Sequence, residues 1–200
     1  MSTTIESLLE RVRSLQEDLE AEYDQRRKAL GGRIEQGRLV FDHEIRARQR
    51  LARMKFRDYV RGIKPMTVVT APVIYSVIVA FALMDVMVTV YMHICFPVYG
   101  IPKVQRRDYV VMDRGMLPYL NWVQKVNCLY CSYGNGVIAY AREIAGRTEA
   151  HWCPIKHARR WEGGHDHYAK FMDYGDEAEF TERWENIRTD LAQMDEQREP

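Results

Sequence analysis

The 200 residues of this chain suit one domain of ordinary size, or a small domain with additional segments. The formal net charge of +1 excludes a strong overall electrostatic preference for nucleic acid or for acidic partners. The charge is distributed unevenly, because residues 1–64 are rich in charged side chains whereas residues 65–102 contain one among 38. This contrast predicts a mainly α-helical, membrane-anchored chain in three parts: a charged helical arm (1–64), a membrane segment (65–102) and a small α-rich Cys/His domain (103–200).

The arm is expected to begin with a helix over residues 5–30. Its apolar positions recur at the 4-3-4 spacing typical of a coiled coil, at Leu8, Val12, Leu15 and Leu19. The repeat covers about two heptads before Glu22 and Arg26 interrupt it. Two interpretations stay open: the arm binds a second copy of the chain or another protein, or it is a solvated helix that packs on its own C-terminal domain.

A second helical stretch is expected after Gly31 and Gly32, with apolar positions running from Ile34 to Tyr59. Its end is strongly basic, with eight Lys and Arg side chains between residues 46 and 64. Beside a membrane segment, such a cluster is typical of the cytoplasmic flank and of binding to anionic lipid. Membrane lipid is therefore an expected partner of the arm, and nucleic acid is not.

The membrane segment begins with twenty uncharged residues, 65–84, which match the ~20 that a helix needs to cross a hydrocarbon core. No cleavable signal peptide is expected, because this stretch lies far from the N-terminus. A straight helix over all 38 residues would be ~57 Å long, against a core of ~30 Å. Two arrangements stay open: a single tilted span over residues 68–92, or a re-entrant hairpin with both ends on one side. The side of the membrane that holds the C-terminal domain depends on this choice.

Asp85 is the one charged residue of the membrane segment. A carboxylate in lipid costs ~2.5–3.5 kcal/mol on insertion scales, so we expect Asp85 to have a functional or pairing role. It could pair with a partner helix, face water, or lie at the tip of a hairpin.

The most specific chemical signal is a C-x2-C-x21-C-x3-H pattern, formed by Cys128, Cys131, Cys153 and His157. A Cys-x2-Cys pair and a second Cys/His pair can supply the four corners of a tetrahedral metal site. A short helix that starts at Asn135 or Gly136 and ends at Gly146 would bring the second pair back to the first. Three thiolates and one imidazole suit structural zinc, and they also suit an iron–sulfur cluster.

Three more histidines are possible additional ligands: His151, His165 and His167. The last two flank Asp166 after two glycines, in a loop that could hold a second metal or a general acid or base. Solvent-exposed histidines without a special role are the alternative. For the cysteines, the alternatives are a Cys128–Cys131 disulfide and unreactive thiols. The C-terminal residues 176–196 predict an amphipathic helix.

Together these patterns predict a membrane-anchored metal-binding accessory protein that handles electrons or metal for a larger membrane complex, or assists its assembly. The alternatives are a structural membrane adaptor with a zinc-stapled domain and an outward-facing thiol–disulfide protein. The sequence contains no phosphate-binding loop, dinucleotide fingerprint, nucleophile elbow or zinc-protease motif. Whether the chain is an enzyme is left open.

Overall fold

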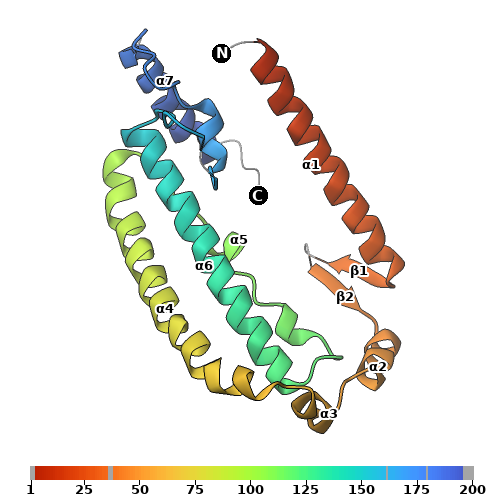
Figure 1. Ribbon diagram of the computed structural model, residues 1–200. Helices are drawn as coiled ribbons and strands as arrows, with labels where there is room; N and C mark the ends of the chain where they lie inside the picture. Colours follow the sequence, from red (N-terminus) through yellow and green to blue (C-terminus); the bar gives the residue numbers. More distant parts are fainter. Residues whose placement is uncertain (1–2, 36–37, 161, 179, 196–200) are drawn as a thin grey trace. The chain divides into compact units, whose positions relative to one another are not determined.

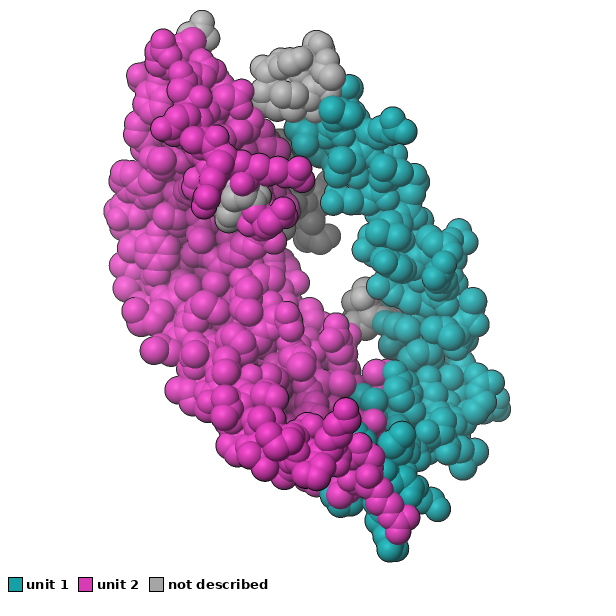
Figure 2. Space-filling model, viewed as in Figure 1, with its two compact units in different colours: residues 1–59, 118–121 teal, residues 60–117, 122–200 magenta. Residues whose placement is uncertain are grey.

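The computed structural model describes residues 3–35, 38–160, 162–178 and 180–195, and the chain is mainly helical (Figure 1). It divides into two compact units, coloured separately in Figure 2. Unit 1 comprises residues 1–59 and 118–121, and unit 2 comprises residues 60–117 and 122–200.

Unit 1 begins with α1 (Thr3–Ala29), which agrees with the helix expected over residues 5–30. The chain does not continue into a second helix there. Gly31 has a φ of 76°, a left-handed conformation that ends the helix. An antiparallel hairpin follows, with β1 (Gly32–Glu35) and β2 (Arg38–Phe41), and only then the short helices α2 (His43–Leu51) and α3 (Phe56–Arg61). The expectation of one helical stretch from Ile34 to Tyr59 is therefore wrong.

Unit 2 contains α4 (Pro65–Tyr99), a continuous helix that is long and apolar enough to cross a membrane. Pro65 occupies the first turn, where its missing N–H is not needed. Gly100 ends the helix with a φ of 68°, and the backbone N–H of Ile101 donates to the carbonyl of Phe96 over 2.9 Å. Because the helix is unbroken from residue 65 to 99, the hairpin alternative is not formed within this segment.

The second long helix, α6 (Trp122–Trp152), lies beside α4 and runs in the same direction (Figure 1). Tyr130 donates to the carbonyl of Ile74 near the start of both helices, and Tyr91 contacts Thr148 near their ends. Parallel helices cannot be joined by a tight turn. The connecting segment therefore has to return along the helices, and it carries α5 (Arg106–Tyr109) and the 3-10 turn η1 (Arg114–Met116).

The apolar core of unit 2 lies between the second half of α4, the start of the connecting segment, the second half of α6 and the C-terminal elements. Those elements are η2 (Asp166–Lys170), α7 (Phe180–Ala192) and η3 (Gln193–Asp195). α7 agrees with the helix expected at 176–196, and Leu191 buries its apolar side in this core. The fully buried centre is formed by Phe96, Tyr140 and Ile144.

Gly136 allows the connecting segment to lie against α6. A Cβ at this position would be 2.8 Å from the Tyr109 carbonyl oxygen and 2.8 Å from Val110 Cα, which are backbone atoms. Ala normally stabilises a helix interior by ~0.5–1 kcal/mol relative to Gly, but overpacking costs ~1–3 kcal/mol. We therefore expect Gly136→Ala to lower the free energy of unfolding, measured by chemical denaturation. Gly164→Ala is the control, because its nearest contact would be an ordinary 3.7 Å, and a more stable Gly136→Ala protein would contradict the close packing.

Candidate functional site

The four expected metal ligands lie at opposite ends of α6. Cys128 and Cys131 are in its first third, whereas Cys153 directly follows its last residue. At a rise of 1.5 Å per residue, the 22 positions between Cys131 and Cys153 span ~33 Å of continuous helix. A zinc ion needs its ligand atoms at ~2.0–2.3 Å. The structure therefore does not bring the two pairs together.

The physical reason is that α6 does not end at its glycines. Gly146 was expected to stop a short helix, yet it lies inside α6, where a Cβ would be 2.8 Å from Cγ of His165. Gly134 and Gly136 are likewise sites of close approach, against Phe81 and the connecting segment. Within the described residues, no group of three or more His, Cys, Asp or Glu side chains could hold a metal ion. The Cys/His centre, whether zinc or iron–sulfur, has no assembled ligand set in this fold.

The thiols are also unpaired with one another, since Cys95, Cys128, Cys131 and Cys153 are all free cysteines. Cys128 and Cys131 are three positions apart inside α6, where Cβ atoms lie ~5–6 Å apart. A disulfide needs ~3.5–4.5 Å between Cβ atoms, so oxidation of this pair would require the helix to bend.

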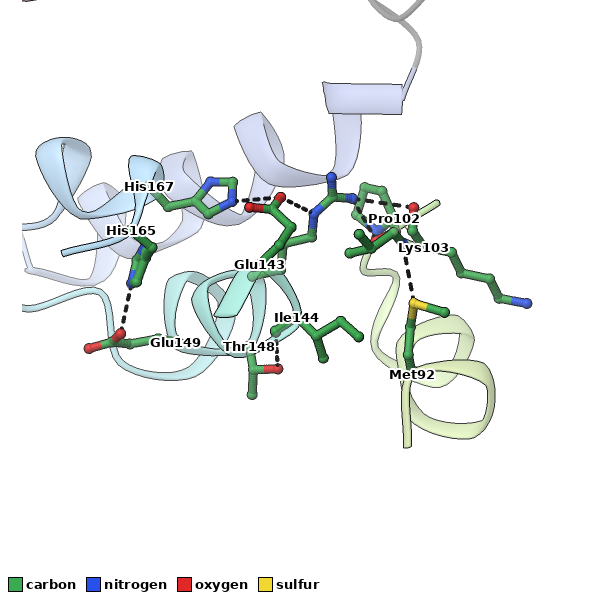
Figure 3. A network of polar contacts seen from close by, with 11 residues as sticks. Met92, Pro102, Lys103, Glu143, Ile144, Thr148, Glu149, His165 and His167 are labelled. Atoms are coloured by element: carbon green, nitrogen blue, oxygen red, sulfur yellow. Dashed lines mark hydrogen bonds and ion pairs between the residues drawn. The ribbon is translucent and has the colours of Figure 1, made fainter. Parts of the chain in front are cut away.

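The structure instead places two of the expected histidines in a buried ion-pair network on the second half of α6 (Figure 3). Arg147 is 1% exposed, and its Nε donates to Glu143 Oε1 over 2.8 Å. The Arg147 guanidinium also donates to the carbonyl of Pro102 over 2.8 Å. His167 Nε2 lies 3.2 Å from the same Glu143 oxygen. The Glu143–Arg147 pair therefore ties α6, the connecting segment and η2 together.

A second His–carboxylate contact lies one to two turns further along α6. His165 Nε2 is 2.8 Å from Glu149 Oε2, and the His165 side chain is 7% exposed. His165 and His167 thus serve as partners of glutamates and fix η2 on α6. His151 stacks on Tyr99, and burial together with the nearby Arg188 charge lowers its pKa.

Glu143 is the most perturbed acid of this network. Burial alone would raise its pKa, but the hydrogen bonds from His167 and Arg147 and the attraction of their charges outweigh burial. The pKa of Glu143 is lowered to about 2, so its carboxylate stays ionised through the physiological range. This network is called the clamp and consists of Glu143, Arg147, Glu149, His165 and His167. The carboxylate of Glu143 at its centre keeps its negative charge.

Asp85 is buried and is paired within the chain. Arg106 donates to both of its carboxylate oxygens, over 2.9 and 2.7 Å, and the Tyr133 hydroxyl donates over 3.0 Å. Of the three roles considered for Asp85, pairing is the one observed, although its partner comes from the connecting segment and from α6. The pair fixes the returning segment beside the middle of α4.

Cys153 and His157 line one open pocket of about 760 Å³ at the end of α6, together with Glu149, Arg159 and Tyr174. The pocket wall is fixed by parallel pairing of Ile155 with Met172. Lys156, which also lines it, pairs with Asp173 at 2.8 Å. The pocket offers one exposed thiol among mostly apolar and basic groups.

Three residues of the clamp, Glu143, Arg147 and Glu149, were not anticipated as a site. The spacing of Glu143 and Arg147, four positions apart, is the sequence signal for an ion pair on one helix face. Nothing in the sequence indicates that Asp85 meets Arg106.

Comparison with protein-family models, curated proteins and solved structures finds no match for this chain. Its function is therefore inferred from its own residues.

Proposed function

We propose that the chain is a membrane-anchored adaptor, held in the bilayer by residues 65–84 of α4. The observation that carries this proposal is the outward apolar surface of that half-helix. No residue of α4 before Asp85 is fully buried. Several aliphatic side chains before it are more than 60% exposed and form one broad face of the helix: Met66, Val68, Val69, Val73, Val79 and Leu83.

Water is a poor solvent for this surface. Burial of a Val, Leu or Met side chain is worth about 1.5–3 kcal/mol, and whole domains are stable by only ~5–15 kcal/mol. If six such side chains stayed in water, the burial free energy lost would be comparable to the free energy of unfolding of a whole domain. α6 packs against one side of this half-helix, and lipid would cover the broad apolar face that remains.

The adaptor part of the proposal is supported by α1 in unit 1. Its apolar positions remain outward, because Leu8, Val12, Leu15 and Leu19 are each at least 50% exposed. Apolar residues at 4-3-4 spacing are typical of the seam of a coiled coil. A second copy of the chain, or a helical protein partner, would cover this stripe.

The anchor is tested by fractionating cells that express the full chain. We expect the protein in the membrane fraction, resistant to high salt and alkaline carbonate, and released only by detergent. Release by salt or carbonate alone would contradict embedding. Recovery as a soluble oligomer would show that other copies, rather than lipid, cover α4.

A further inference from the structure

The basic stretch before α4, residues 46–64, has a large excess of positive charge. It contains eight Lys and Arg side chains and one acidic residue, Asp58. Among the described residues, none of these eight cations forms an ion pair. By contrast, Arg26 and Arg27 of α1 are both paired with nearby acids. The side chains of Arg50 and Arg53 donate to the backbone carbonyls of Arg46 and Pro118.

The same stretch exposes apolar side chains between its cations. Leu51 is 88% exposed, Met54 50%, Phe56 45% and Val60 45%. Neither α2 nor α3 has a buried residue among those described. A segment that presents both arginines and large apolar groups is typical of helices that lie in a membrane interface.

The position of the stretch in the chain points to the same partner. Lys64 directly precedes Pro65, the first residue of α4. An extended chain spans at most ~3.6 Å per residue, so Tyr59 stays within ~22 Å of Pro65, where α4 starts. If α4 is embedded as proposed, residues 59–64 are held close to the surface of the same bilayer.

We infer that residues 46–64 form an interfacial segment that binds anionic lipid headgroups, an inference that rests on the proposed anchoring by α4. The arginines and lysines bind the phosphate and carboxylate groups of the lipids. Leu51, Met54 and Phe56 enter the boundary between headgroups and acyl chains. Each cation strengthens such binding by about fivefold.

The test uses the full chain in nanodiscs of phosphatidylcholine alone or of phosphatidylcholine with phosphatidylserine. Hydrogen exchange of the amides in 46–64 is the readout. We expect exchange at least about tenfold slower in the anionic discs, and faster again in high salt, because salt screens charges at the surface. The variant R48Q/K55Q/R57Q should lose this protection, since three cations together account for roughly 100-fold in binding.

The matched control is R11Q/R13Q/K28Q, which removes the same charge from exposed positions of α1 and should keep the protection. Equal exchange in both kinds of disc, or loss of protection in the control, would overturn the inference. The inference would also be overturned if the chain bound duplex DNA, the triple variant abolished that binding, and anionic lipid had no effect on exchange. A chain that elutes apart from the discs would instead refute the anchor, which separates the two failures.

Discussion

Two lysines in the exposed apolar half of α4 should release the chain from membranes. Val73 and Val79 are each 68% exposed and lie within residues 65–84, so their replacement removes little packing inside the protein. Lysine near the centre of a membrane helix costs ~2.5–3.5 kcal/mol, which gives about 5–7 kcal/mol for Val73→Lys/Val79→Lys. We expect most of the variant outside the carbonate-resistant membrane fraction, measured by quantitative immunoblotting.

Val73→Leu/Val79→Leu is the matched control, since it changes the same positions without adding charge. It should fractionate like the wild-type chain. Circular dichroism of both variants in detergent checks that the helices persist. Retention of the lysine variant in the carbonate-resistant fraction would mean that these side chains do not face lipid, and the anchor would then have to lie elsewhere.

The helices with a strong local signal could be predicted from the sequence. α1 is specified by charged residues around a 4-3-4 apolar repeat, α4 by its uncharged run, and α7 by its amphipathic spacing. These signals lie within a few consecutive turns. They depend little on which other part of the chain packs nearby, so the sequence alone is sufficient to read them.

The candidate site depended instead on contacts between distant residues. Gly134, Gly136 and Gly146 resemble helix ends in sequence, but α6 passes through all three. Close neighbours occupy the space that a Cβ would need at each of them. This continuity is what separates Cys131 from Cys153. The spacing of ligands in sequence does not show how long a rigid helix between them is. The motif alone therefore could not show that the two ligand pairs lie far apart.

The pairing of Asp85 with Arg106 illustrates the same limit. The sequence marks Asp85 as exceptional, because it is the one charge in a long apolar run. Its partner lies 21 positions away, after the helix has ended and the chain has turned back. Only the direction of the connecting segment, set by the parallel packing of α4 and α6, determines which cation it meets.

The clamp at Glu143 provides the second large expected effect. Glu143→Gln keeps the shape of the side chain but removes the charge opposite Arg147, which is 1% exposed. Removal of one partner from a buried ion pair costs ~3–5 kcal/mol, because the other charge stays in a medium of low dielectric constant. Arg147 retains its bond to the Pro102 carbonyl, so we expect the lower end, about 3 kcal/mol, by chemical denaturation in detergent.

The variant should also change the response to acid. With a pKa of about 2 in the folded chain against 4.5 as the ordinary value, Glu143 contributes about 3 kcal/mol above pH 4.5. That contribution is lost as the pH falls from 4.5 toward 2, because the unfolded chain then binds the proton more readily. Glu143→Gln should therefore flatten the decline in stability over this range.

Asp190→Asn is the matched control, a carboxylate-to-amide change in an exposed pair with Lys170 at 3.5 Å. Exposed pairs contribute ~0–1 kcal/mol, so its stability and acid response should stay close to those of the wild-type chain. If Glu143→Gln were as mild as this control, the Glu143 carboxylate would not be the charge that holds η2 and the connecting segment on α6. The fixed placement of His165 and His167 would then depend on the apolar contacts around Phe171 instead.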